Sequence, residues 1–445
     1  MAVSPARSAA FEILLRVERE DSYAAELLHS AALSKLSARD HGLTTELVMG
    51  VLRWRALLDG RVAAASSLKI ERMDGEVLTA LRLGAYQLLF LSRVPARAAI
   101  FESVELVKAA RKRSAAPLVN AVLRKVGGAE AADFFAKIEG ARDAEELALA
   151  AAHPRWIVER WVERYGLEMA RGICAYDQTV PETAISIDDG RCKEDLAGVG
   201  LAPGRLLTSA RRVVSGDVTA TRAYREGQVA FQDEGSQLVA LLAGRATSVD
   251  GAILDCCAAP GSKTALMARR NPRAKVVATE VHAHRARLLK TLCRIPNVFV
   301  VAADARRLPF NSGFDRVLAD VPCSGTGTLG RNPEIKWRLR EEDLRDLHGR
   351  QVAILKAALG QLARGGRLVY STCSLEREEN ETVVEAALGA EFEVVDCRGE
   401  LERLREAGEI AGGVEVGSLV DGSFLRTIPG VHGCDGFFAA VIARR

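Results

Sequence analysis

The stretch DCCAAPGSKT, residues 255–264, decides the fold, because it joins a strand pattern to a helix pattern through a turn of small residues. The apolar run 252–254 just before it is typical of a buried strand. In open α/β sheets such a turn binds a ligand carboxylate or phosphate. Its glycine lets backbone N–H groups approach closely, and the helix N-terminus that follows favours negative charge. The stretch therefore predicts a doubly wound α/β domain with a ligand crevice at this edge of the sheet.

Two later segments indicate the chemistry of that crevice. They read ADVPCSGTG at 319–327 and VYSTCS at 369–374, and in each a strand pattern ends near a cysteine. The carboxyl ends of the strands in a doubly wound sheet face one crevice. We therefore expect the thiols of Cys323 and Cys373 to point at a single site.

The rest of the chain divides by pattern. Apolar residues at helical spacing predict helices throughout the N-terminal part, and short strands with loops follow from about residue 181. Alternating strand and helix patterns then predict a mainly parallel, doubly wound sheet. The predicted domains are 1–130 (all-α), 131–226 (a helical linker and a small α+β subdomain) and 227–445 (α/β). The predicted helices are 6–18, 44–58, 76–91 and 98–110, and the predicted strands of the sheet are 252–255, 275–280, 298–303, 315–320, 367–371, 393–397 and 437–442.

Composition excludes some classes of protein. The 445 residues carry a net charge of only +3, but residues 1–130 hold 19 Lys and Arg against 14 Asp and Glu. That excess, with the cluster 111–113, predicts either a phosphate-binding surface or a solvated helix face. No apolar run approaches the roughly 18 residues of a membrane span, and no signal peptide is visible. Nine cysteines without paired spacing favour a cytoplasmic protein with reduced thiols and no metal site.

Acidic residues at three successive strand ends suggest which ligand the crevice takes. NAD is disfavoured because its glycine fingerprint is absent, and a nucleoside triphosphate because Ser262 separates Gly261 from Lys263. S-adenosylmethionine fits best, with its carboxylate on the turn, its ribose on Glu280 and its adenine near Asp304. The predicted cofactor site comprises Cys257, Ala258, Ala259, Pro260, Gly261, Ser262, Lys263, Glu280, Arg285, Asp304 and Asp320.

Two thiols, an acid and a methyl donor favour methylation at C5 of a pyrimidine. That carbon is a poor nucleophile until a thiolate adds to C6, after which C5 can attack a methyl group. A base then removes the C5 proton and the thiolate leaves. An acid near N3 would stabilise the charge that develops during addition, and Asp320 is the candidate.

The three segments 255–264, 320–327 and 371–374 resemble the RNA cytosine-C5 methyltransferases of the Nop2/Sun type. Residues 332–337 and 378–381 also look like segments of that family. The resemblance implies that Cys373 is the nucleophile and that Cys323 assists release. The remaining cysteines are interpreted as packing residues: Cys174, Cys192, Cys256, Cys257, Cys293, Cys397 and Cys434.

The N-terminal motifs at 39–54, 83–89 and 119–124 resemble those bacterial 16S rRNA cytosine-C5 methyltransferases that carry a domain like the RNA-binding antitermination factor NusB. The resemblance implies three parts: an all-α NusB-like RNA-binding bundle, a small α+β RNA-binding subdomain and a Rossmann-like methyltransferase domain. It also implies methyl transfer to a specific cytidine of 16S rRNA through a covalent cysteine–C6 adduct, by a protein that we expect to be a monomer.

One departure and two alternatives accompany that resemblance. The family's middle subdomain carries an arginine where this chain has Ser186, so we expect another arginine to take its place. The candidates are Arg191, Arg211, Arg212 and Arg222. The first alternative function is tRNA modification by the same chemistry. The second is a non-enzymatic RNA-binding or antitermination factor, which the intact Asp320, Cys323 and Cys373 disfavour.

Overall fold

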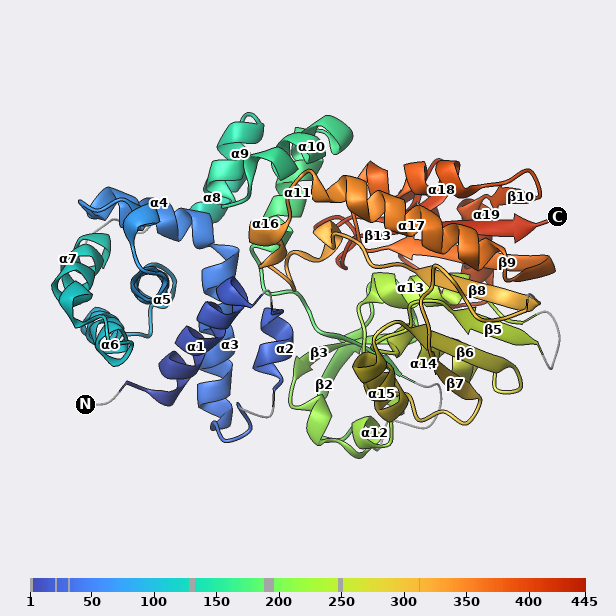
Figure 1. Ribbon diagram of the computed structural model, residues 1–445, viewed down its shortest axis with the longest axis horizontal. Helices are drawn as coiled ribbons and strands as arrows, with labels where there is room; N and C mark the ends of the chain where they lie inside the picture. The colour runs from blue at the N-terminus through green and yellow to red at the C-terminus, as the bar shows by residue number, and fades with distance from the viewer. Residues whose placement is uncertain are drawn as a thin grey trace. The chain divides into compact units, whose positions relative to one another are not determined.

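The computed structural model describes residues 3–20, 22–30, 33–127, 133–187, 196–246, 251–311 and 313–445. The chain forms two compact units (Figure 1). Unit 1 comprises Met1–Val180 and Leu329–Leu339, and unit 2 comprises Pro181–Thr328 and Arg340–Arg445. The predicted boundary at 226/227 does not coincide with the division between the units, and the one at 130/131 lies outside the described residues. The three-domain division stays a prediction.

Unit 1 is helical, as expected. The helix predicted at 44–58 is interrupted at Trp54, whose indole is buried against Phe90 (5.0 Å between ring centroids) and Phe134 (5.4 Å). The buried ring therefore lies at the junction of α3 and α4, where the periodicity predicted one continuous helix. The helices of unit 1 are α1 (Pro5–Arg19), α2 (Ala24–Leu28), α3 (Ala38–Arg53), α4 (Arg55–Ala65), α5 (Gly75–Phe90), α6 (Ala96–Ala109), α7 (Ala116–Gly127), α8 (Phe134–Glu139), α9 (Ala144–Ala150), α10 (Arg155–Tyr165), α11 (Leu167–Asp177) and α16 (Ile335–Arg338).

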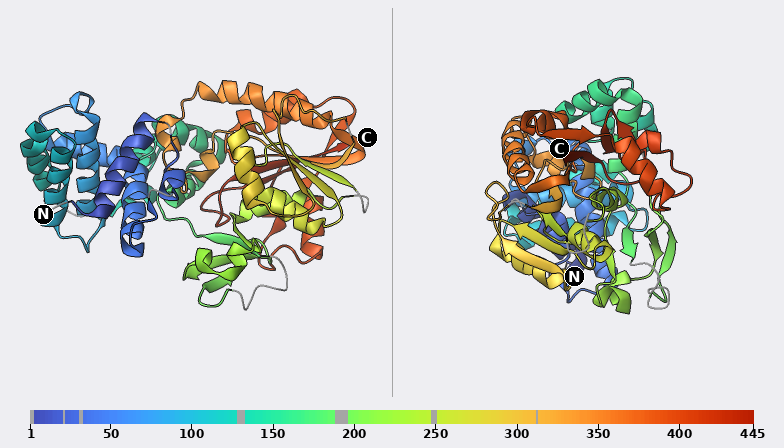
Figure 2. Two further views of the ribbon diagram at one scale, coloured as in Figure 1. Left: turned by 60° about the horizontal axis from the view of Figure 1, so that its bottom comes forward. Right: turned by 90° about the vertical axis from the view of Figure 1, so that its right-hand side faces the viewer.

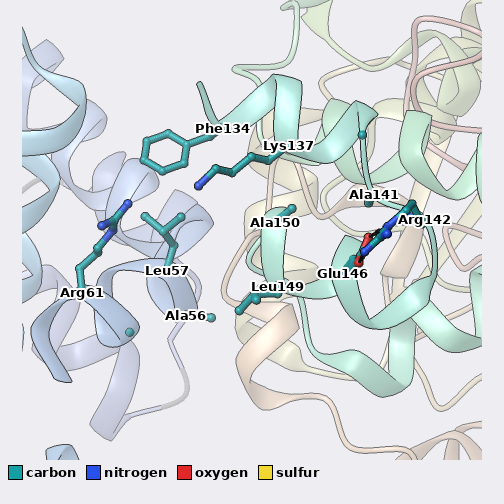
Figure 3. Close-up of a pocket in the computed structure, with 12 residues that line it drawn as sticks. Ala56, Leu57, Arg61, Phe134, Lys137, Ala141, Arg142, Glu146, Leu149 and Ala150 are labelled. Carbon is teal, nitrogen blue, oxygen red and sulfur yellow. Dashed lines mark hydrogen bonds and ion pairs between the residues drawn. The ribbon is translucent and has the colours of Figure 1, made fainter. Parts of the chain in front are cut away.

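Unit 1 contains an open cavity of about 640 Å³ lined by residues of α4, α8 and α9. Figure 3 shows Leu57, Phe134 and Leu149 around it, with the Arg142–Glu146 ion pair at one side. None of the predicted site residues lines this cavity.

Unit 2 begins with a small antiparallel sheet of order β2-β3-β1-β4. Its strands are β1 (Ala184–Ile187), β2 (Gly200–Pro203), β3 (Ala210–Ser215) and β4 (Val229–Phe231), with the short helix α12 (Arg222–Arg225) between β3 and β4. Ile185, Val218 and Val229 are buried together in its core. The short strands expected from residue 181 are thus present.

The large sheet of unit 2 has the order β11-β12-β13-β9-β8-β5-β6-β7, and β10 pairs with β13. The five strands from β9 to β7 pair in parallel, whereas β10, β11, β12 and β13 pair antiparallel. The expectation of a mainly parallel sheet is therefore wrong for the C-terminal part. The bounds are β5 (Ala252–Asp255), β6 (Lys275–Glu280), β7 (Val298–Ala302), β8 (Phe314–Asp320), β9 (Leu362–Thr372), β10 (Phe392–Val395), β11 (Val420–Asp421), β12 (Phe424–Thr427) and β13 (Phe437–Arg444).

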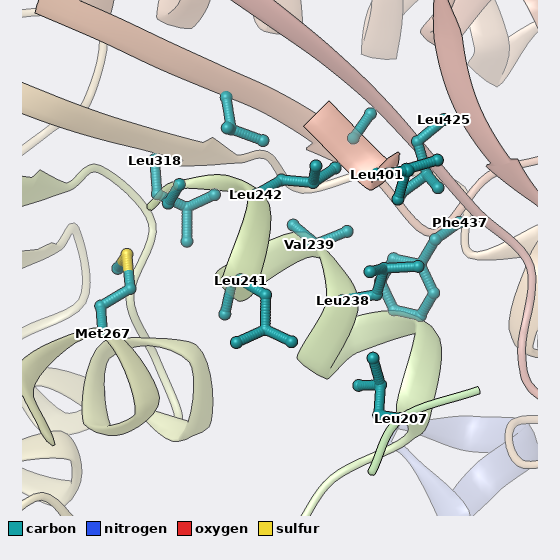
Figure 4. Packing of buried hydrophobic residues seen from close by; sticks show 14 of the residues in the cluster. Leu207, Leu238, Val239, Leu241, Leu242, Met267, Leu318, Leu401, Leu425 and Phe437 are labelled. Carbon is teal, nitrogen blue, oxygen red and sulfur yellow. The ribbon is translucent and has the colours of Figure 1, made fainter. Parts of the chain in front are cut away.

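Both faces of the large sheet are covered, which explains its nearly continuous apolar strands. Consecutive residues alternate between two buried clusters: Leu318 and Val369 lie in one, Val317 and Leu368 in the other. Helix α13 (Glu234–Leu242) fills the first cluster, as Figure 4 shows, and α17 (Asp343–Leu359) contributes Leu355 to the second. Figure 2 shows helices on both sides of the sheet. The other helices of unit 2 are α14 (Ser262–Arg270), α15 (Ala283–Leu292), α18 (Glu381–Ala387) and α19 (Cys397–Glu406).

Candidate active site

The turn after β5 is built to present backbone N–H groups. Gly261 has φ +115°, and a side chain there would meet Leu289 Cδ1 at 2.5 Å, so a residue without Cβ is required. The first intrahelical hydrogen bond of α14 runs from Ala265 N to Gly261 O at 2.8 Å. The amides of residues 262–264 precede that bond and are available to an anion.

The first half of the turn is already engaged. Cys256 N donates to Leu318 O on β8 (2.8 Å), and Ala258 N donates to Thr279 O on β6 (2.9 Å). Asp255 is buried, accepts from Thr264 Oγ1 at 2.6 Å, and has its pKa raised to about 7, chiefly by burial. These contacts fix the shape of the turn and engage the backbone N–H groups of Cys256 and Ala258 within the protein.

The two acids of the neighbouring strand ends differ in their surroundings. Glu280 ends β6, is 6% exposed, and has only Arg285 as a distant cation, with Nη1 3.9 Å from Oε2. Asp304 follows β7, and Arg306 binds both of its oxygens, which lowers its pKa. Glu280 accepts from the backbone N–H of His282 at 2.9 Å, whereas both oxygens of Asp304 are held by the guanidinium of Arg306.

The side chain of Lys263, at the start of α14, reaches Asp320 at the end of β8. Its Nζ lies 2.8 Å from Asp320 Oδ2, and Ser371 Oγ donates to Asp320 Oδ1 at 2.7 Å. Burial disfavours the charge on Lys263, but the attraction of Asp320 is stronger, and the pKa of Lys263 is raised. The side chain thus serves this ion pair, and only its backbone belongs to the turn.

The two predicted thiols lie together. Cys323 Sγ and Cys373 Sγ are 3.3 Å apart, and Cys373 N is 3.3 Å from Cys323 Sγ. The contact with Cys373 and burial both raise the pKa of Cys323. The electrostatic effect of Cys373 on Lys263 places the ion pair and the thiols in one neighbourhood. The structure therefore joins Cys323, Cys373, Asp320 and Lys263 at one edge of the sheet.

Residues that the sequence analysis did not assign surround the thiols. Glu379 is fully buried and binds the loops of both cysteines through Ser324 and Ser374. Gln351 of α17 donates to Pro322 O (3.0 Å) and to Glu379 Oε1 (2.8 Å). In the sequence, the only signal for Glu379 is that residues 378–381 resemble a segment of the family.

The candidate RNA-contacting arginines of the small sheet bind protein groups. Arg211 donates to Thr208 O, Arg212 pairs with Glu182 (2.6 Å), and Arg222 pairs with Glu226 (2.6 Å). Arg191 lies outside the described residues, as does Cys192. Nothing in these contacts selects a substitute for the arginine that Ser186 replaces.

The other cysteines agree in part with a packing role. Cys174, Cys256, Cys293, Cys397 and Cys434 are buried, while Cys257 is half-buried beside the turn. Within the described part of the chain, no three His, Cys, Asp or Glu side chains are grouped as a metal site would require. No helix among the described residues has the length and apolarity to cross a membrane.

Comparison with known proteins finds a matching family for each half of the chain. Residues 242–443 match the family model for 16S rRNA methyltransferase RsmB/F, and residues 4–127 match the NusB family. The probable ribosomal RNA small subunit methyltransferase B of Bacillus subtilis (strain 168) is 32% identical, over 99% of this chain and 98% of that protein.

Two solved structures share the fold. PH0851 superimposes with a TM-score of 0.80 at 20% identity, covering all of both chains. NSun6 from Pyrococcus horikoshii, solved with SFG, has a TM-score of 0.54 at 19% identity over 64% of this chain and 97% of that chain. The full-length sequence match and the two family models give the family: the chain belongs to the RsmB/F rRNA cytosine methyltransferases and carries an N-terminal NusB region.

Proposed function

We propose that this protein transfers a methyl group from S-adenosylmethionine to C5 of one specific cytidine in 16S rRNA through a covalent cysteine–C6 adduct. The observation that carries the proposal is the pair of thiols 3.3 Å apart beside the Lys263–Asp320 ion pair. Membership of the RsmB/F family supports the choice of rRNA over tRNA.

The residues of the crevice fit the cofactor. The free amides at the start of α14 suit its carboxylate, and Glu280 suits its ribose hydroxyls, with Arg285 close by. When bound, S-adenosylmethionine supplies an electrophilic methyl group. We assign the cofactor to residues 257–263 together with Glu280, Arg285, Asp304 and Asp320.

The protein's own groups divide the remaining work. Cys373 as thiolate adds to C6, and the charge that develops on the ring is met at N3 by a proton from the Lys263–Asp320 pair. Because the pKa of Lys263 is raised, this proton resides on Lys263, and Asp320 orients it. After methyl transfer, Cys323 takes the C5 proton, and the C6–sulfur bond breaks to release Cys373 and the product. The raised pKa means that Cys323 carries a proton at rest, so it has to release that proton to solvent before it accepts the one from C5.

The target base has to leave its stack, because a paired and stacked cytosine does not present C6 to a thiolate. We expect the NusB region and the small sheet to supply RNA affinity. A decline of that affinity with rising salt would mark phosphate contacts.

Trapping separates the roles of the two cysteines. Cys323→Ala should form the adduct and fail to resolve it, leaving a denaturant-stable complex of protein and methylated RNA. Cys373→Ala should form no adduct and show no turnover. Bisulfite mapping of 16S rRNA and tRNA, with and without the protein, identifies the target. Trapping by Cys373→Ala would reverse the assignment, and full activity of both variants would overturn the covalent mechanism.

A further inference from the structure

One buried carboxylate connects the two cysteine-bearing loops. Glu379 Oε1 accepts from Ser324 N at 2.8 Å, and Glu379 Oε2 accepts from the hydroxyls of Ser324 and Ser374. Ser324 directly follows Cys323, and Ser374 directly follows Cys373. A single side chain therefore holds the residue next to each thiol.

The environment of Glu379 holds its carboxylate in one position. The side chain is 0% exposed, and its donors are two hydroxyls, one amide N–H and the side-chain amide of Gln351. A buried carboxylate needs such donors to offset the loss of its hydration. The two serine hydroxyls also lie 3.0 Å apart. The loops contact each other elsewhere too, where Gly327 N donates to Cys373 O and Leu375 N donates to Thr326 Oγ1, both at 2.9 Å.

The backbone around Glu379 is tied to the strand that leads to Cys373. Tyr370 OH on β9 donates to Glu379 O at 2.5 Å, and Asn380 Nδ2 donates to Ser374 O at 2.9 Å. Thr372 Oγ1 donates to Asn380 Oδ1 at 2.5 Å. These bonds fix the carboxylate relative to β9, so that its bonds to Ser324 help to set the position of the Cys323 loop, together with the bond from Gln351 to Pro322 O.

We propose that Glu379 is a positioning residue that holds the Cys323 and Cys373 loops at the separation needed for release of the methylated product. The catalytic part of this statement depends on the proposed function, whereas the control of the thiol separation does not. Displacements of about 1 Å between reacting groups can lower rates by roughly 10²-fold, so loss of this positioning would weaken the step that uses both thiols.

The thiol separation can be measured without RNA or cofactor. The full-length protein is equilibrated with reduced and oxidised glutathione, and the Cys323–Cys373 disulfide is quantified by peptide mass spectrometry. Two protein thiols and one oxidised glutathione give the protein disulfide and two reduced glutathiones. The equilibrium ratio gives the effective concentration of one thiol at the other.

Glu379→Ala should lower this effective concentration by at least about tenfold. Ser374→Ala, which removes one donor and leaves Glu379 in place, should lower it less and keeps the test valid should Glu379→Ala not fold. Glu385→Ala removes an exposed carboxylate of α18 and should match the wild type. An unchanged effective concentration in both Glu379→Ala and Ser374→Ala overturns the proposal.

Kinetics test the catalytic consequence. Glu379→Ala should lower kcat and accumulate some adduct, with KM for rRNA and cofactor affinity close to those of the wild type. Loss of cofactor binding in a folded Glu379→Ala variant would indicate a wider structural role and overturn the assignment. A further outcome is that the wild type forms no RNA adduct while Glu379→Ala still lowers the effective concentration of the thiols. That result contradicts the covalent mechanism but supports the positioning role of Glu379.

Discussion

Two lysines of low exposure, one in each unit, have pKa values that are shifted in opposite directions, although burial lowers the pKa of both. Lys263 of unit 2 faces Asp320 at 2.8 Å, and its pKa is raised. Lys336 of unit 1 is 1% exposed and has its pKa lowered to about 7 by burial. The difference shows that the partner, rather than burial itself, decides the charge of a buried amine.

The surroundings of Lys336 are largely carbonyl oxygens. Its Nζ donates to Arg53 O at 2.9 Å and lies 3.4 Å from Ala152 O. Nearby Asp177 raises the pKa of Lys336, while the positive charge of Arg53 lowers it further. His153 binds Asp177 at 3.2 Å and has its own pKa lowered, by burial and by Lys336. The contacts of this cluster are with other groups of unit 1, whereas Lys263 lies at a sheet edge with two half-buried thiols.

A perturbed pKa is therefore no sufficient sign of an active site. Lys336 has the strongly lowered pKa that catalytic lysines often show, yet it joins residues 329–339 to the helices of unit 1. Lys263 carries the proposed function because several strand ends converge on it.

The largest effect that we expect is on the stability of unit 1. Lys336→Ala should lower its free energy of unfolding by roughly 3–5 kcal/mol, because the change leaves a cavity and removes the donor from two buried carbonyls. Lys336→Met keeps the volume and removes the cost of burying an amine, so its loss should stay below about 1.5 kcal/mol. Tryptophan fluorescence in urea measures this, since Trp54, Trp156, Trp161 and Trp337 all belong to unit 1. Equal losses in both variants would show that the cavity is not the main term.

A somewhat smaller effect is expected on the turnover number when Lys263 is replaced. Lys263→Met should reduce turnover by about 10²–10³-fold, roughly 2.7–4 kcal/mol, because the proposed proton near N3 is lost. Lys263→Arg keeps a cation beside Asp320 and should retain more of the activity. The tryptophan-monitored unfolding should not change in either variant. Wild-type turnover in Lys263→Met would remove the ion pair from the mechanism.

The smallest effect, counted per pH unit, concerns the pH dependence of stability. A lowered pKa means that the folded protein binds the proton of Lys336 less well than the unfolded chain does. Between about pH 7 and the unfolded value of about 10.4, the free energy of unfolding of unit 1 should therefore rise with pH, by up to about 1.4 kcal/mol per unit from this residue. Below about pH 7 both states hold the proton, and this stabilising contribution is gone.

Lys263 has the opposite sign. Its raised pKa contributes stability that is complete below the unfolded pKa and is lost as pH rises through the folded one, so it adds no slope between pH 7 and 9. Urea unfolding across that range should show a flatter pH profile for Lys336→Met than for the wild type, with Lys263→Met unchanged. Parallel profiles for wild type and Lys336→Met would contradict the lowered pKa.

The sequence alone determined much of the site. The glycine turn at 255–264, and the cysteines near two strand ends, are local patterns whose meaning follows from the parallel pairing of β5, β8 and β9. Because all three carboxyl ends face one edge, the meeting of Cys323 and Cys373 could be predicted. The N-terminal helices followed equally well from their periodicity, except at Trp54, where aromatic packing interrupts the helix.

Only the tertiary structure decided the partners of the buried charges and the pairing of the last strands. Nothing local shows that Lys263 reaches Asp320, that Glu379 binds both cysteine loops, or that Lys336 enters unit 1. The antiparallel addition of β13 to β9 was likewise invisible, because an apolar strand reads the same in either direction. The sequence pattern indicates which residues are buried. Whether a buried group is charged, and in which direction a strand pairs, depend on neighbours that are distant along the chain.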